Sequence, residues 1–239
     1  MRNKEIDLIK GISVIFMIIF HYFYVGKVLH KLVVNIDNGF LNFMAVFAHT
    51  TFIICMGINS VLSKQNHKKQ NKSDKEYYQK LFNRVLLFGS IAFFMSFSSY
   101  LIFGFDTFIK FGIFHYMTIG TIIISYFADK STLAILFSML LLFIKDYKNP
   151  NLNKLLGCIT GFNMTYGSLD YFPLNKWLPY SLLGVILGNN LNNNKNFTKK
   201  INNIIDNNTL LTLICKLGSN TIPIYISHFV IFYLFFVFN

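Results

Sequence analysis

The sequence predicts an all-α polytopic membrane protein, a bundle of about seven transmembrane helices. Hydrophobic residues make up 54% of its 239 residues and charged residues only 13%, against about 25% charged in an ordinary soluble domain. Several apolar stretches approach the ~20 residues that a helix needs to cross a hydrocarbon core of ~30 Å. Runs such as IFMIIFHYF and FVIFYLFFVF are apolar on every face, whereas polar and apolar residues alternate along the strands of a membrane barrel. This pattern favours helices.

Apolar runs along the chain define the expected spans, which are 8–29, 40–63, 85–103, 111–127, 131–146, 177–191 and 218–238. The stretch 155–169 is also apolar and fits either a re-entrant segment or an extra helix, so six to eight spans stay open. The polar segments 64–84 and 189–208 indicate solvated loops, and we expect a single membrane-embedded domain over 1–239. The first span exceeds a signal-peptide core and no small-residue cleavage site follows it, so it is expected to remain in the protein.

The basic residues predict the orientation. With a cytoplasmic N-terminus, fifteen of the 22 Lys and Arg residues fall inside and seven outside. The fifteen are Arg2, Lys4, Lys10, the seven in 64–84, Lys130, Lys195, Lys199, Lys200 and Lys216. The C-terminus is then extracytoplasmic. Topology and attraction to anionic membrane lipids account for the net charge of +12, so no nucleic-acid partner is expected.

The cysteines do not indicate a metal site. Cys55, Cys158 and Cys215 are isolated in the sequence and lack the Cys or His spacing of a zinc site. We interpret them as packing residues and expect no metal. The tract NNLNNNKNFTKKINNIIDNN has low complexity and is interpreted as a loop.

Titratable side chains within the predicted spans are the candidate functional groups, because placing them in hydrocarbon is costly unless they face an interior cavity. Four of the six histidines, His21, His49, His115 and His228, fall within spans. Each one alone is explained by a hydrogen bond between helices. Four together favour a polar interior.

The first span carries the clearest pattern. Asp7 and Lys10 are three residues apart and can pair near the cytoplasmic boundary. His21 follows Lys10 by eleven positions, so it lies within about 20° of the same helix face and about 16 Å further along the helix. A cytosolic donor with a phosphate head and a long arm can bind at the first point and react at the second. The alternative is that Lys10 extends to lipid phosphate and His21 packs.

The outer ends of other spans supply further polar residues. His115 lies one turn into the fourth span, and Asp170 and Trp177 lie in the segment SLDYFPLNKWLPYSLLG. Asp170 can orient an imidazole or bind a sugar hydroxyl, or it can be a solvated loop residue. Trp177 fits an interfacial aromatic belt.

The last span places His228 near mid-membrane, and Pro223 is expected to kink it. Ser219 and Asn220 are then positioned to cap the helix or to line a cavity.

Five motifs follow one another along nearly the whole chain: RNKEIDLIKGISVIFMIIFH, FIICMGINS, FGIFH, DYFPLNKWLPYSLLG and LGSNTIPIYISH. In this order they resemble the catalytic membrane domain of heparan-α-glucosaminide N-acetyltransferase and its short bacterial relatives. A larger group of membrane acyltransferases also shares a basic residue followed eleven positions later by His, as in Lys10 and His21.

The resemblance implies an enzyme that takes acetyl from cytosolic acetyl-CoA and delivers it to an amine or hydroxyl of an extracytoplasmic sugar or glycolipid. Three departures stand out. Lys10 replaces the usual Arg and so loses a bidentate grip on phosphate, and Lys176 precedes Trp177 where the family has Pro. In the human-type enzyme the catalytic His lies in the outer loop, which makes His30 a second candidate beside His21.

The sequence thus predicts three groups of site residues. The catalytic group is His21, His115, Asp170 and His30. The acetyl-CoA group is Lys10, Asp7, Lys80, Arg84 and Lys216. The substrate-cavity group is His228, Asn220, Ser219 and Trp177.

Two other function classes stay open. One is a small-molecule transporter or lipid flippase with an intramembrane His and Asp pathway, and the absence of a clear inverted repeat in the sequence disfavours it. The other is a non-catalytic partner of a polysaccharide synthesis machine. Homodimerisation is also left open.

Overall fold

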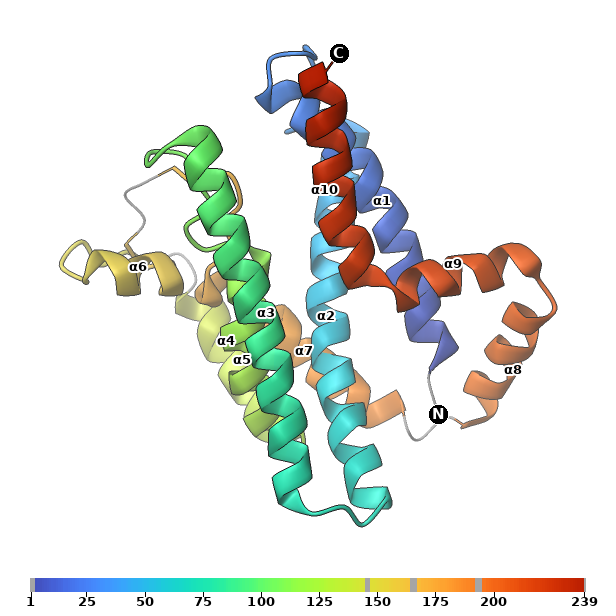
Figure 1. The fold of residues 1–239 in the computed structure, drawn as a ribbon. Coiled ribbons are helices and arrows are strands. Elements are labelled where there is room, and N and C mark those ends of the chain that lie inside the picture. The colour runs from blue at the N-terminus through green and yellow to red at the C-terminus, as the bar shows by residue number, and fades with distance from the viewer. Residues whose placement is uncertain (1–2, 145–146, 164–166, 192–194, 239) are drawn as a thin grey trace. The chain divides into compact units, whose positions relative to one another are not determined.

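The structure is a computed structural model that describes residues 3–144, 147–163, 167–191 and 195–238, in which helices are joined by turns and loops (Figure 1). Arg2, the end of the expected span 131–146 and part of the stretch 155–169 lie outside the described residues. The helices are α1 (Lys4–Val28), α2 (Gly39–Lys69), α3 (Asp74–Phe103), α4 (Ile113–Phe127), α5 (Ser131–Ile144), α6 (Lys154–Thr160), α7 (Leu174–Leu191), α8 (Lys195–Asp206), α9 (Thr209–Ser219) and α10 (Thr221–Phe238).

The helices form two compact units. The terminal unit consists of residues 1–55 and 193–239, and the central unit consists of residues 56–192. The division falls within α2, so the first half of this helix belongs to the terminal unit and the second half to the central unit. The expectation of one domain over 1–239 stays a prediction.

In the terminal unit, α1 packs along α10 and is crossed by α9 (Figure 1). Two glycines set the crossing. A Cβ atom on Gly218 would lie 1.8 Å from the carbonyl oxygen of Asp7, and one on Gly11 would lie 2.0 Å from that of Ile214. No side chain fits at either point, so the backbones of α1 and α9 are in direct contact. This contact fixes the first half of α1 against α9.

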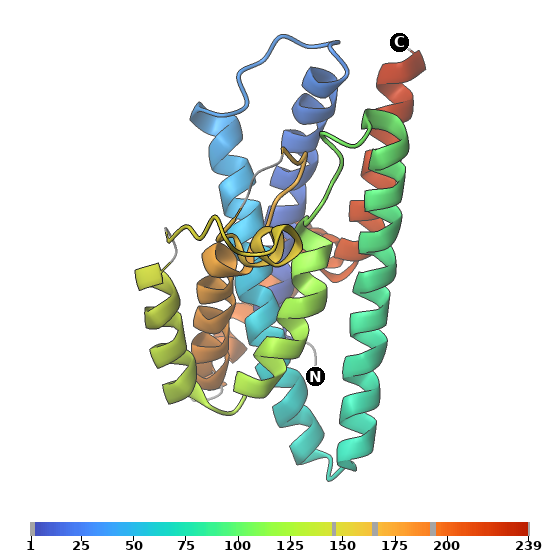
Figure 2. The same cartoon turned by 90° about the vertical axis from the view of Figure 1, so that its left-hand side faces the viewer.

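In the central unit, α3 packs on α4, and α7 packs on α4 and α5 (Figure 2). The core between α4, α5 and α7 is apolar and includes Ile124, Leu182 and Val185, which are fully buried. The second half of α2 contacts α7 through Gly57, where a Cβ would lie 2.0 Å from the carbonyl oxygen of Ser181.

The helical membrane bundle predicted from the sequence is confirmed, but the count of seven spans is not. Four helices, α1, α2, α3 and α10, are long and apolar enough to cross a membrane. Helices α4 and α5 have 15 and 14 residues, which is about 21–23 Å of helix against a hydrocarbon core of ~30 Å. Helix α7 also has 18 residues but is not apolar enough along them to count among these four.

The predicted loop 64–84 is helical except for residues 70–73, since α2 continues to Lys69 and α3 begins at Asp74. Three further local expectations are corrected. The described part of 155–169 holds all but the first residue of α6, a helix of seven residues. At about 10 Å this helix is too short to be an extra span, and the re-entrant alternative stays a prediction. The predicted loop 189–208 contains α8, because Ile205 is 2% exposed and anchors this segment.

The third correction concerns the last span, which is not one kinked helix. It breaks at Asn220 between α9 and α10, and Pro223 lies in the first turn of α10. A proline there removes no helical hydrogen bond, because first-turn N–H groups have no partner within the helix.

Candidate active site

Two imidazoles meet inside the terminal unit. His21 of α1 and His228 of α10 are 8% and 4% exposed, and His21 Nδ1 lies 3.0 Å from His228 Nε2. The two helices run side by side (Figure 1), so residues 207 positions apart form one hydrogen-bonded pair. The structure therefore joins the predicted catalytic histidine to a residue that the sequence placed only in the substrate cavity.

The hydrogen bonds define which nitrogen carries each proton. His228 Nδ1 lies 3.0 Å from the carbonyl oxygen of Ile224, and a carbonyl only accepts, so the neutral His228 ring carries its proton on Nδ1. Its Nε2 then accepts, and His21 Nδ1–H donates to it. A neutral His21 is left with a lone pair on Nε2, the nitrogen that can take a proton or attack an electrophile.

Aromatic rings enclose the pair. The ring of Phe229 lies 4.6 Å from both imidazoles, measured between centroids, and Tyr225 lies 5.9 Å from His21. His21 is also hydrogen-bonded to the backbone of Met17, and His49 of α2 is close enough to interact with it electrostatically. His21 and His228 thus form one site, held in orientation by packing, and His49 lies within electrostatic range of it.

An ion pair lies toward the start of the same helix. Lys10 Nζ is 2.7 Å from Asp7 Oδ1, and the two side chains are 16% and 8% exposed. The pairing predicted from their spacing is confirmed. Cys55 of α2 interacts electrostatically with both residues, and the backbone of Gly218 covers Asp7. Because Lys10 has three N–H donors, the bond to Asp7 leaves donors for an anionic ligand.

The other predicted residues of the terminal unit have backbone roles. His30 is exposed and ends α1 with a left-handed backbone, φ +58°, and its N–H donates to the carbonyl oxygen of Lys27. Ser219 Oγ and Asn220 Nδ2 both donate to the carbonyl oxygen of Lys216, at 2.8 and 2.9 Å, and so cap α9. Their predicted roles in catalysis, donor binding and cavity lining stay predictions.

His115 lies in the central unit with both ring nitrogens engaged. The N–H of Gly112 donates to His115 Nδ1 at 3.2 Å, so Nε2 carries the proton and donates to Ser96 Oγ at 3.1 Å. Ser96 in turn donates to the carbonyl oxygen of Ile109. This chain joins the start of α4 to α3, which gives His115 a structural role.

Asp170 caps the same helix. Its Oδ2 accepts a hydrogen bond from the N–H of Ile113 at 2.9 Å. Burial raises the pKa of the Asp170 carboxyl to about 6, although that hydrogen bond lowers it. Asp170 and His115 belong to the central unit and His21 to the terminal unit, so the support that they were predicted to give His21 stays a prediction.

The remaining predicted residues also belong to the central unit. Lys80 and Arg84 are exposed on α3. Trp177 is buried in α7, where its ring packs 4.9 Å from Phe172, between centroids, and its carbonyl accepts a hydrogen bond from Tyr116. Trp177 is thus a packing residue here. Among the residues that the structure describes, no three His, Cys, Asp or Glu side chains gather as metal ligands do.

A known family covers both units. The sequence profile described as heparan-alpha-glucosaminide N-acetyltransferase, catalytic, matches residues 2–230. The chain belongs to this family. Neither the curated proteins nor the solved structures include a significant match. As a member of the heparan-alpha-glucosaminide N-acetyltransferase catalytic family, the protein is a membrane acyltransferase of the acetyltransferase type, in a family that generally uses acetyl-CoA as donor.

Sequence reasoning missed the partner of His21 in this family member. Both His21 and His228 lie within the matched residues, and both end matching motifs, FMIIFH and IYISH. The sequence signal that could have paired them is that both residues are histidines well inside apolar spans.

Proposed function

We propose that this family member transfers an acetyl group from cytosolic acetyl-CoA to an amine or hydroxyl group of an extracytoplasmic sugar or glycolipid. The observation that supports this most is the hydrogen bond between His21 and His228. It favours the tautomer in which His21 Nε2 has a free lone pair, which an acyl transfer requires of its base or nucleophile.

In a direct transfer, His21 Nε2 acts as a general base. The nitrogen or oxygen of the acceptor bonds to the thioester carbonyl carbon while Nε2 takes its proton. The bond between that carbon and sulfur then breaks, and the departing thiolate of CoA takes the proton back from His21. The positive charge on His21 is shared with His228 through their hydrogen bond, which keeps the ring oriented.

In a covalent transfer, His21 Nε2 is the nucleophile. It bonds to the carbonyl carbon, the thiolate of CoA leaves, and an acetyl-imidazolium forms because Nδ1 keeps its proton. The acceptor then attacks the same carbon, the bond from that carbon to Nε2 breaks, and the acceptor's proton passes to the CoA thiolate or to water, so neutral His21 is restored. This route permits ping-pong kinetics, whereas the direct route requires both substrates together.

Lys10 is the proposed contact for a phosphate group of the donor. Its side chain is 16% exposed and is held by Asp7, so its position is set before a ligand arrives. Lys216 on α9 is exposed in the same unit. Lys80 and Arg84 belong to the central unit, and their part in donor binding stays a prediction. The span between positions 10 and 21 is about 16 Å of helix, which suits a donor with a long arm between phosphate and thioester.

Purified protein in detergent, given radiolabelled acetyl-CoA and a panel of amino and neutral sugars, tests the proposal. We expect acetylated sugar from the wild type. His21→Ala should lower turnover by ~10²–10⁴-fold and leave CoA binding, measured by calorimetry, unchanged. Exchange of label between acetyl-CoA and CoA without acceptor separates the covalent route from the direct one.

Two outcomes would contradict the proposal. One is uptake of a sugar into liposomes without any acetylation, which supports a transporter. The other is normal turnover by folded His21→Ala, which moves the chemistry to another residue, with His30 as the next candidate.

A further inference from the structure

An aromatic pocket lies beside the last three turns of α3, where the chain turns back through the loop 104–112 toward α4 (Figure 2). Its volume is about 360 Å³, which falls in the range of ligand pockets. The lining residues come from α3 and from this loop, and they are Phe93, Ser96, Phe97, Tyr100, Phe105 and Phe108. All but the serine are aromatic, so the walls of the pocket are apolar.

The lining residues of α3 form one face of the helix. Positions 93, 96, 97 and 100 follow the spacing i, i+3, i+4 and i+7, and they cover about 10 Å along the helix. Phe93, Phe97 and Tyr100 are 71%, 52% and 47% exposed. Because α3 is long and apolar enough to cross a membrane, this exposed face meets lipid hydrocarbon and not water.

Ring contacts join the helix wall of the pocket to the loop wall. The Phe93 and Phe97 rings stack with 6.2 Å between their centroids. Tyr100 packs edge-on against Phe108 at 5.7 Å, and Phe105 lies 5.8 Å from Phe108. The rings of the helix end and of the loop therefore support one another, so the pocket has fixed walls.

The serine of the pocket is already hydrogen-bonded. Ser96 Oγ donates to the carbonyl oxygen of Ile109 at 2.6 Å and accepts from His115 Nε2 at 3.1 Å. A sugar ring would bring several hydroxyl groups that need partners when they are buried, whereas a hydrocarbon chain needs none. Aromatic walls and a satisfied serine thus favour a hydrocarbon ligand.

A cation lies at the loop end of the pocket. Lys110 Nζ is 5.1 Å from the centroid of the Phe108 ring and 5.8 Å from that of Phe105, and both rings line the pocket. The same nitrogen donates to the carbonyl oxygens of Asp106 and Gly167, at 2.9 and 2.6 Å. These contacts hold the ammonium group beside the pocket, in a loop that follows the end of the span, where lipid headgroups lie.

We propose that this pocket binds one acyl chain of an anionic phospholipid, with the phosphate group of the lipid at Lys110. The order of the groups along the protein supports this ligand. A cation lies at the headgroup level, and about 10 Å of apolar helix face leads from it into the membrane, which is the order of charge and hydrocarbon in a phospholipid. An ammonium group attracts a phosphate through its charge. This lipid site is independent of the proposed acyl transfer.

Two lipids test the head and the tail of this ligand separately. The purified full chain in detergent is titrated with phosphatidylglycerol, and with a diacylglycerol that has the same two acyl chains but no phosphate. Native mass spectrometry measures the lipid bound at each concentration. We expect a saturable site for phosphatidylglycerol that binds it about tenfold more tightly than diacylglycerol, since one charge-assisted contact distinguishes the two lipids.

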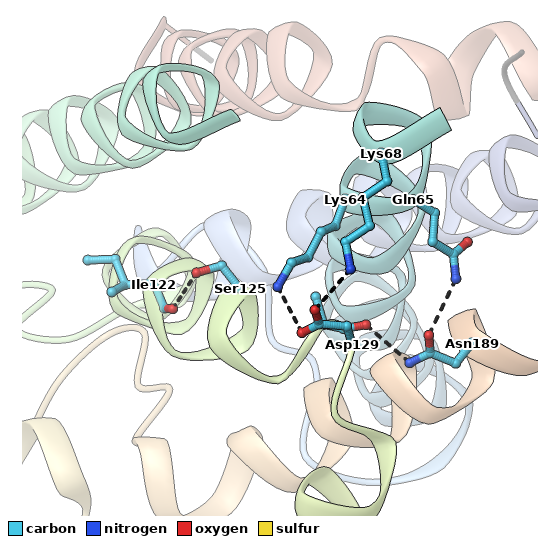
Figure 3. A network of polar contacts seen from close by, with 8 residues as sticks. Lys64, Gln65, Lys68, Ile122, Ser125, Asp129 and Asn189 are labelled. Atoms are coloured by element: carbon cyan, nitrogen blue, oxygen red, sulfur yellow. Dashed lines mark hydrogen bonds and ion pairs between the residues drawn. The ribbon is translucent and has the colours of Figure 1, made fainter. Parts of the chain in front are cut away.

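Changes at Lys110 test the head. Lys110→Gln should remove the preference for phosphatidylglycerol and leave diacylglycerol binding unchanged, whereas Lys110→Arg keeps the charge and should keep the preference. Lys68→Gln is the matched control, because Lys68 lies in the last turn of α2, near the start of α3 and away from the pocket. Its ammonium binds Asp129 at 3.2 Å, and Lys64 binds the same carboxylate (Figure 3). This control should bind phosphatidylglycerol as the wild type does.

A change at Phe93 tests the tail. Phe93→Ala removes part of the pocket wall and should weaken the binding of both lipids several-fold. Phe94→Ala is its control, because Phe94 is the next residue of α3 and is 64% exposed, against 71% for Phe93, but it does not line the pocket. Both side chains are mostly exposed, so both variants should keep the melting temperature of the wild type.

Several results would overturn the proposal. They are an absence of saturable phosphatidylglycerol binding, loss of the lipid preference in Lys110→Arg, a loss in Lys68→Gln equal to that in Lys110→Gln, and equal effects of Phe94→Ala and Phe93→Ala. Saturable binding of glucosamine that disappears in Phe93→Ala would also overturn it and would identify a sugar site instead.

Discussion

The contact between α1 and α9 gives the clearest quantitative prediction. In Gly218→Ala, the new Cβ atom would lie 1.8 Å from the carbonyl oxygen of Asp7 and 2.6 Å from the backbone nitrogen of Gly11. Both obstacles are backbone atoms of a packed helix, so no side-chain rotation relieves the overlap. The helices must move apart by more than an ångström, and packed interiors resist such shifts.

Two effects of this substitution oppose each other. Alanine favours a helix over glycine by up to about 1 kcal/mol, whereas overpacking typically costs about 1–3 kcal/mol. Since the overlap is with backbone, we expect the larger end of this range and a net loss of stability of about 1–2 kcal/mol. For a chain of this size, 1 kcal/mol corresponds to a shift of about 2–4 °C in melting temperature.

Gly89→Ala is the matched control. Gly89 is also helical, but its nearest obstacle, the Cγ2 atom of Thr118, is 3.6 Å from the new Cβ, an ordinary contact. It should leave the melting temperature in detergent unchanged or raise it, while Gly218→Ala lowers it by several degrees and reduces turnover of acetyl-CoA. Equal melting temperatures for Gly218→Ala and the wild type would refute the backbone contact, as would an equal loss in Gly89→Ala.

Four further predictions concern the candidate sites. His228→Phe keeps an aromatic ring but removes the acceptor for His21. Since one hydrogen bond is worth about 1 kcal/mol, kcat should fall about fivefold with the KM for acetyl-CoA unchanged, and unchanged kcat would reject the pair as a catalytic unit. Lys10→Ala should raise that KM in a salt-sensitive way, while Lys10→Arg should be tolerated; equal CoA affinity by calorimetry would leave Lys10 as a lipid anchor. His30→Gly should keep the fold, because glycine accepts the left-handed backbone, so lost turnover in a stable variant would place the chemistry at His30. Asp170 has a folded pKa raised from 3.8 to about 6, so its ionisation opposes folding above pH 6 and this cost disappears as the pH falls toward 4. Asp170→Asn keeps the cap oxygen and should remove that pH dependence from the melting temperature, and loss of turnover without loss of stability would instead support a catalytic Asp170.

The long spans were predictable because their signal is local. In α1, α2, α3 and α10, enough consecutive apolar residues follow one another to cross a bilayer. The shorter helices were harder, since α4 and α5 have the apolar character of a span but not its length. Helix α8 was missed because its Asn and Lys content is typical of a loop, and only the burial of Ile205 distinguishes it.

The structural roles of glycine and proline residues also depend on tertiary structure. The sequence marks Pro223 as a helix breaker, but whether it kinks a helix or begins one depends on where the helix starts, and Asn220 sets that start. Likewise, the close approach of Gly218 to the backbone of Asp7 cannot be inferred from the presence of Gly11 and Gly218 in separate motifs. It depends on how α9 crosses α1.

By itself the sequence determined the membrane class, the family motifs and the pair of Asp7 and Lys10, because a helix fixes the geometry of residues three or four apart. Tertiary structure alone decided that His228 is the partner of His21, that His115 on α4 pairs with Ser96 on α3, and that Lys64 and Lys68 share Asp129. These contacts join residues on separate elements of the chain, and their distances follow from how the helices pack, which no local spacing in the chain encodes.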